Sequence, residues 1–132
     1  MKTHALFGHA TIEPTETGWV AQCLETGGLA AGATVDWVIE SIIEQAGQFV
    51  VEELAAGRGV PNNAAAWDEV ARWSAMAAQG APVRLTKDVA QQAEALREPL
   101  VIEFTLIIDE TRIERPLVTA FHKPANYATL AG

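Results

Sequence analysis

The chain has a single cysteine, Cys23, among its 132 residues. One cysteine cannot form a disulfide within the chain, and it cannot complete a zinc site that needs two or four cysteines. Cys23 lies in an alternating apolar segment, which favours a small buried side chain over a nucleophile. A disulfide-stabilised fold and a cysteine-based zinc fold are therefore both excluded.

Basic residues are also scarce, with 9 Lys and Arg against 17 Asp and Glu and a net charge of −8. The few basic side chains are scattered, and affinity for a phosphate backbone comes largely from lysine and arginine. We therefore expect no direct binding to nucleic acid. The charge fits either a solvated acidic surface or attraction to a basic protein partner.

Long apolar runs are missing as well. No segment approaches the ~18 apolar residues that cross a bilayer, and the first residues lead into no apolar stretch with a cleavage site. We expect no membrane association and a cytoplasmic location.

Recognisable catalytic signatures are absent too. The three histidines are His4, His9 and His122, and the first two fall on opposite faces of an expected strand, so they cannot chelate one metal. No nucleophile elbow and no phosphate-binding glycine loop occurs. We therefore expect no catalytic residues, no cofactor and no metal.

The first half of the chain shows clear local patterns. Residues 5–13 and 19–24 alternate like strands and are joined by turn formers, which predicts an antiparallel hairpin. Glycines then mark a loop over 27–32. From Val35 to residue 54, apolar residues recur every three or four positions behind Thr34, a good N-cap, which predicts a long amphipathic helix.

The second half predicts helices over 64–79, with Asn62 or Asn63 as cap, and over 87–97, with Thr86 as cap. A strand over 100–108 and a partner over 112–121 follow, with Pro116 placing the partner at an edge or a bulge. These elements predict one α+β domain over 1–132, an antiparallel sheet with helices packed on one face, in the order β-β-α-α-α-β-β. Its parts are a β-β-α unit over 5–57, a helical segment over 62–98 and a C-terminal β-hairpin over 100–121.

Residue order in the first 57 residues resembles the HicB-like family, whose small domains pair strands and a helix like a partial ribonuclease-H-type fold. The residues that carry the resemblance are Gly18-Trp19-Val20-Ala21, Cys23-Leu24-Glu25, Leu29-Ala30 and Gly32-Ala33-Thr34. Ala33 replaces the usual acidic residue. Trp37 stands where an acidic residue would close a capping box onto Thr34, so that reciprocal bond is not expected.

The resemblance implies an antitoxin, whose N-terminal domain binds a small basic RNA-cleaving toxin and whose C-terminal part binds operator DNA. The second half of this chain has no basic recognition helix, so DNA binding is not carried over. What the resemblance still implies for this chain is the module that binds the protein partner.

Large aromatic side chains at the margins of apolar faces are typical of interfaces, although they also cover core edges. The interface candidates are therefore the four tryptophans together with two glutamates that would serve as acidic contacts: Trp19, Trp37, Glu40, Glu44, Trp67 and Trp73. The sequence thus predicts a non-enzymatic protein-interaction module that forms a homo-oligomer and binds a small basic partner. The alternatives are a small enzyme or ligand-binding domain with a pocket between sheet and helices, and an assembly component that uses the fold for packing.

Overall fold

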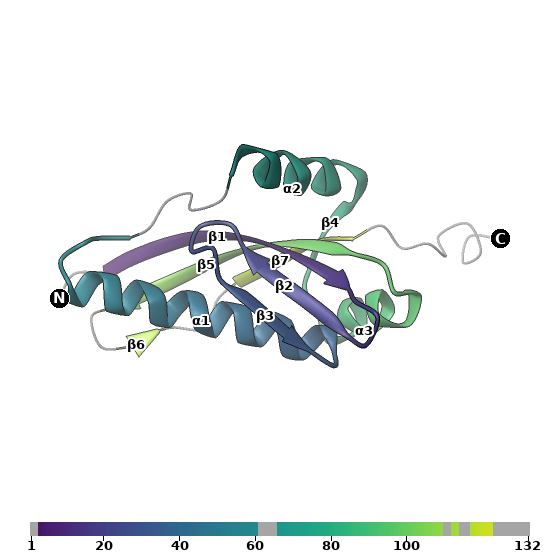
Figure 1. The fold of residues 1–132 in the computed structure, drawn as a ribbon, viewed down its shortest axis with the longest axis horizontal. Helices are drawn as coiled ribbons and strands as arrows, with labels where there is room; N and C mark the ends of the chain where they lie inside the picture. Colours follow the sequence, from purple (N-terminus) through teal and green to yellow (C-terminus); the bar gives the residue numbers. More distant parts are fainter. Residues whose placement is uncertain (1–2, 61–65, 110–111, 114–116, 123–132) are drawn as a thin grey trace.

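The computed structural model describes residues 3–60, 66–109, 112–113 and 117–122. They form an α+β fold around an antiparallel sheet (Figure 1). Along the chain the described elements are β1 (Thr3–Pro14), β2 (Trp19–Cys23), β3 (Leu29–Gly32), α1 (Val35–Ala55), α2 (Trp67–Gln79), β4 (Ala81–Arg84), α3 (Lys87–Leu96), β5 (Leu100–Asp109), β6 (Arg112–Ile113) and β7 (Leu117–His122). The predicted class and the approximate order of elements are confirmed.

The strands follow one another across the sheet as β3-β2-β1-β5-β7-β4, and β6 pairs with β5. β1 is central: its last residues pair with β2, and it pairs with β5 along ten successive positions from Thr3 to Ile12. β3 lies where a loop was expected, and β4 lies between two helices. Both strands have four residues. A segment this short does not show the alternation of apolar and polar residues by which a strand is predicted from sequence.

The predicted partner strand over 112–121 is divided into β6 and β7, and residues 114–116, with Pro116, lie outside the described residues. β7 pairs with β5 on one side and with β4 on the other. It is therefore an interior strand of the described sheet, which corrects the edge position, while the other alternative, a bulge at Pro116, falls outside the described residues. The edge on this side of the sheet is β4, where Pro82 is tolerated because an edge strand has one unpaired side.

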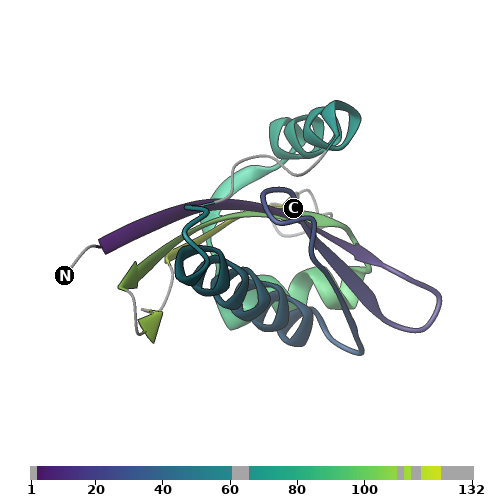
Figure 2. The ribbon, with the colours of Figure 1, turned by 60° about the vertical axis from the view of Figure 1, so that its left-hand side comes forward.

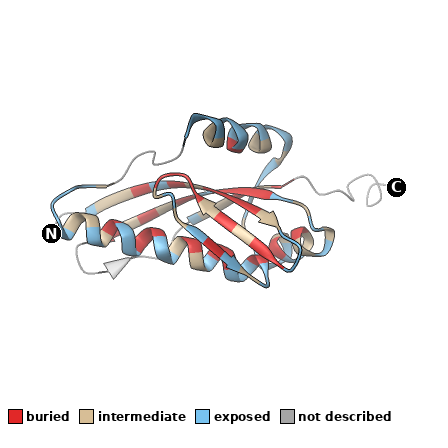
Figure 3. Ribbon diagram, viewed as in Figure 1, coloured by how far each residue is buried: buried red, intermediate tan, exposed pale blue. Residues whose placement is uncertain are grey.

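One face of the sheet packs against α1 and α3 (Figure 2). Thr34 caps α1 as predicted, its hydroxyl accepting from the Trp37 backbone N–H at 3.2 Å. Figure 3 shows the buried residues gathered on the strands and on the inner side of the helices. The buried residues that α1 contributes to this core are Val35, Val38, Ile39, Ile42, Ala46 and Val50.

α2 packs on the opposite face of the sheet, whereas all helices were expected on one face (Figure 1). Its buried residue Trp73 joins Leu24 and Val101 in a second apolar cluster. The reason is that β5 is apolar on both faces at its start, since Leu100 and Val101 point to opposite sides and are both buried. The predicted caps Asn62 and Asn63 lie outside the described residues, and α2 begins at Trp67 without a side-chain cap.

Candidate functional site

The outer surface of α1 carries a line of exposed acidic and amide side chains. Its members are four residues apart, so each lies about 40° further round the helix than the one before, and the line winds obliquely across the outer surface through about 160° from its first member to its last. From its first member to its last the line rises about 24 Å along the helix axis. We call it the acidic stripe, and it consists of Asp36, Glu40, Glu44, Gln48 and Glu52.

None of the four carboxylates of the acidic stripe forms an ion pair with another described residue. The nearby cation Arg58 is engaged elsewhere, since its Nε lies 2.7 Å from Glu53 Oε2, and this pairing lowers the pKa of Glu53. Like charges four residues apart destabilise a helix by about 0.2–0.5 kcal/mol per pair. Glu52 also lies in the last turn, where the helix dipole disfavours negative charge. Positive charge from another molecule would relieve both effects.

Two exposed aromatic residues flank the acidic stripe. Trp37 is 53% exposed near one end and Phe49 is 37% exposed near the other. The Trp37 ring lies against Gly32, where an added Cβ atom would overlap it, so this glycine is required for the close approach of the ring. Beside Phe49 is a shallow hollow of about 410 Å³, lined by Ser41, Glu44, Gln45, Gln48, Phe49 and Glu52.

The predicted interface residues are thus divided. Trp37, Glu40 and Glu44 share the outer surface of α1, and Trp67 is 86% exposed at the start of α2. Trp19 and Trp73 are only 2% and 8% exposed, which corrects their prediction as surface contacts. Trp19 faces inward on β2 because of strand alternation, and the Arg97 guanidinium lies 5.9 Å from its ring centre.

A cluster around His9 was not foreseen from the sequence. Glu25, which is 7% exposed, accepts the His9 backbone N–H at 2.6 Å through Oε1. Its Oε2 lies 2.8 Å from His9 Nδ1, and His9 Nε2 lies 3.9 Å from Glu103. Glu25 follows the end of β2, so its carboxylate takes the place of a strand partner for β1. No local signal marks this pair, because its members are 16 positions apart.

The His9 cluster also fixes α2. The Trp73 and His9 rings meet edge to face, with centres 4.8 Å apart, and Trp73 Nε1 donates to the Ala10 carbonyl at 3.1 Å. The hydrogen bond to Glu25 raises the pKa of His9 against the opposing effect of burial. Burial raises the pKa of the Cys23 thiol, so Cys23 is not an activated nucleophile. An imidazole that pairs with a carboxylate, as His9 does with Glu25, can exchange protons. In this structure the His9 ring also contacts Trp73 and so helps to position α2.

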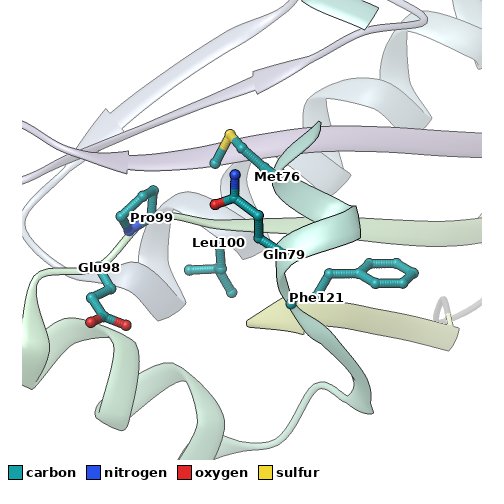
Figure 4. A pocket seen from close by; sticks show the side chains of 7 residues that line it. Met76, Gln79, Glu98, Pro99, Leu100 and Phe121 are labelled. Carbon is teal, nitrogen blue, oxygen red and sulfur yellow. The ribbon is translucent and has the colours of Figure 1, made fainter. Parts of the chain in front are cut away.

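A second hollow, of about 250 Å³, lies between the end of α2 and the start of β5 (Figure 4). His122 Nε2, buried and without a hydrogen bond among the described residues, lies 3.6 Å from the carboxylate of Glu98. Burial lowers the pKa of His122. The third histidine, His4, pairs with Ile108 on β5 and points to the other face of β1 from His9, as predicted. The residues that line the hollow are Met76, Gln79, Gly80, Glu98, Pro99, Leu100 and Phe121.

No protein-family model, no curated protein and no solved structure matches the chain. None of the described helices has the length and apolar character to span a membrane. Within the same part of the chain, no group of three or more histidine, cysteine or acidic side chains is placed to hold a metal ion.

Proposed function

We propose that this protein is a non-enzymatic interaction module that binds a small basic protein along the outer surface of α1. The observation that supports this proposal is the acidic stripe, whose four carboxylates have no basic partner among the described residues. The HicB-like resemblance of the first half implies a partner of the same chemistry, a small basic toxin that the module neutralises.

The geometry of the acidic stripe defines what the partner must present. Lysine or arginine residues spaced about 6 Å apart, as on one face of a basic helix, would meet the successive carboxylates of Asp36, Glu40 and Glu44, which lie within about 80° of one another round α1. Trp37 supplies the aromatic anchor that such interfaces use as a hot spot. Because the contacting charges are exposed, association should be fast and should weaken as salt is added.

We also propose that the module is a homo-oligomer and that it acts in the cytoplasm. The lone cysteine fits a reducing compartment, in which a small domain gains nothing from disulfides.

The direct test is a pull-down against the product of the neighbouring gene, followed by calorimetry on any complex found. Glu40→Lys and Glu44→Lys should each weaken binding about fivefold or more, since each replaces an attraction by a repulsion. The matched control is Glu16→Lys, the same charge change at an exposed residue in the turn after β1. An equal loss of binding in this control would refute the assigned surface, and the absence of any complex would refute the partner.

The small-enzyme alternative rests on the His9–Glu25 pair, an imidazole oriented by a carboxylate as in general-base sites. Hydrolysis of p-nitrophenyl acetate offers a simple assay. An enzyme of this kind should lose its rate above buffer in His9→Asn and keep it in His4→Asn, the matched control on the other face of β1. Equal rates in both variants and in the unmodified protein would remove this alternative.

A further inference from the structure

The strand β3, at one edge of the described sheet, presents backbone groups that no other described residue binds (Figure 1). It pairs with β2 on one side, and its other side is open. The Cys23 N–H donates to the Gly28 carbonyl at 2.9 Å, which shows where this ladder is hydrogen-bonded. Bonded pairs alternate along an antiparallel ladder. Ala30 therefore bonds to β2, and the N–H and C=O groups of Leu29 and Ala31 point to the open side.

The opposite edge strand, β4, is closed to a further strand. The Leu85 N–H donates to the Val118 carbonyl at 3.0 Å, so by the same alternation Pro82 and Arg84 are the residues of β4 that point to its open side. Proline has no N–H to donate, and proline and charged side chains are devices by which proteins prevent pairing at a sheet edge.

The edge strand β3 has neither of these devices. Its residues are Leu29-Ala30-Ala31-Gly32. Both edge strands have four residues, so their length does not distinguish them. One edge is thus blocked at the position where a donor would be needed, and the other offers its donors and acceptors in full. This difference indicates that β3 can receive a strand.

The surroundings of β3 indicate which strand it receives. α1 begins directly after the turn that follows β3, and the Trp37 ring lies against Gly32, the last residue of β3. Asp36 and Glu40, the first members of the acidic stripe, therefore lie close to this edge. A second copy, with its own net charge of −8, would bring another acidic stripe to the same place and be repelled. A strand that carries lysine or arginine would be attracted.

We propose that β3 is the docking edge for a strand of the basic partner, which extends the sheet by one antiparallel strand. The inference rests on the proposed function and deepens it, because it assigns a second contact next to the acidic stripe and the secondary structure that makes it. All the described ladders are antiparallel, and antiparallel pairing is slightly more stable per residue than parallel pairing.

The geometry of β3 sets the pattern of the incoming strand. Leu29 pairs with Gln22, which binds Glu69 of α2, so partner residues opposite Leu29 and Ala31 would point to the face of α2. The residues between them would point to the face of α1. There a lysine or arginine opposite Gly32 would contact the exposed Trp37 ring, a favourable cation–π arrangement. The partner strand should therefore alternate apolar and basic side chains.

An NMR titration of the isotope-labelled protein with a synthetic peptide tests the proposal. The probe is acetyl-Lys-Val-Lys-Val-Lys-Val-Lys-amide, which has the expected alternation. It should shift the amide signals of Leu29 and Ala31 in a saturable manner and leave those of β4 in place. The same peptide with glutamate in place of lysine should bind at least fivefold more weakly, because it lacks the attraction to the acidic stripe.

N-methylation of the peptide separates backbone pairing from charge. In the antiparallel arrangement the valine N–H groups donate to β3, and the lysine N–H groups point away from it. A peptide with N-methylated valines should therefore bind at least tenfold more weakly. The matched control is the peptide with N-methylated lysines, which should bind as the unmodified peptide does.

A substitution in the protein makes the same test from the other side. Ala31→Pro removes a donor from the open side of β3 without removing a hydrogen bond to β2, and it should weaken peptide binding at least fivefold. The matched control is Arg84→Pro, the same kind of change on the open side of β4, which should bind the peptide no more weakly than the unmodified protein. Circular dichroism checks that each variant folds. If Ala31→Pro does not fold, the two N-methylated peptides still decide the question on the unmodified protein.

Three results would overturn the proposal: no shift at Leu29 and Ala31, equal binding of the two N-methylated peptides, or shifts of these amides that depend on protein concentration without any peptide. The last result would assign β3 to a second copy. Failure of the peptide, with partner binding still sensitive to Glu44→Lys, would refute the edge and leave the acidic stripe. Binding of the peptide at β3, with no basic partner recovered, would count against the proposed function only.

Discussion

Replacing Glu25 by glutamine tests whether a buried carboxylate holds β1, the segment after β2 and α2 together. Its Oε1 accepts the His9 backbone N–H at 2.6 Å, and its Oε2 lies 2.8 Å from His9 Nδ1. Cys23 Sγ also lies 3.8 Å from Oε1. Glutamine keeps the size of the side chain, but it loses the charge and turns one acceptor into a donor. If its oxygen keeps the His9 backbone N–H, its amide group faces His9 Nδ1, which accepts from it only in a neutral ring and which meets it donor to donor when the ring is protonated.

The expected cost follows from these contacts. A hydrogen bond to a charged group contributes about 1.5–3 kcal/mol, and a buried donor left unpaired costs about 1–3 kcal/mol. Glu25→Gln keeps one of its two bonds to His9 in neutral form. We therefore expect the free energy of unfolding to fall by about 2 kcal/mol, which urea titration resolves.

The loss of unfolding free energy in Glu25→Gln should depend on pH, and the His9 pKa sets the direction of this dependence. The pKa of His9 is raised in the folded state, chiefly by the hydrogen bond to Glu25. Protonated His9 therefore adds stability that is fully present below its unfolded pKa, about 6.5, and is lost as the pH rises through the higher folded pKa. Since the variant lacks the main cause of the shift, the difference between the two proteins should be largest in acid and should shrink above neutrality.

His122 contributes a pH dependence of the opposite sign. Burial lowers its pKa, so it costs stability as the pH falls below about 6.5. Both proteins contain His122, and its contribution cancels when the variant is subtracted from the parent. The difference in unfolding free energy, measured from about pH 5.5 to pH 8.5, therefore isolates His9.

The assay combines urea unfolding with an NMR titration of the His9 ring. Glu103→Gln is the control, because this carboxylate is exposed and lies 3.9 Å from His9 Nε2. It should change the free energy of unfolding by less than about 1 kcal/mol. If Glu25→Gln left both the stability and the His9 titration unchanged, the carboxylate would not hold the cluster. An equal loss at every pH would mean that Glu25 acts through the hydrogen bond with the His9 backbone N–H and not through the charge of the His9 ring.

Three further substitutions test the packing. Gly8→Ala should destabilise the fold by about 1–3 kcal/mol in a thermal melt, because a Cβ atom there would overlap the ring of Phe104; an unchanged melt would refute that contact. Trp73→Phe removes the donor to the Ala10 carbonyl and should cost about 1 kcal/mol in urea unfolding, and a neutral result would deny that bond any role. Thr34→Ala should lose about 1 kcal/mol through the N-cap of α1, measured in the same way.

The sequence predicts α1 well because its signals are local. A capping threonine and an apolar residue every three or four positions are enough to fix where a helix starts and which side it buries. The strand β5 is predicted for the same kind of reason, since its residues alternate over 100–108. The central hairpin also follows from alternation on either side of a turn.

The face that α2 covers could not be predicted, because it depends on side chains brought together by folding. Leu24, Val101 and Phe121 are far apart in the chain, and they become one apolar surface only when β2, β5 and β7 enter the same sheet. The His9–Glu25 pair depends in the same way on β2 ending at Cys23. The acidic stripe, in contrast, is visible in the sequence as acidic residues four apart, and it includes Glu40 and Glu44, the two acidic contacts named among the interface candidates.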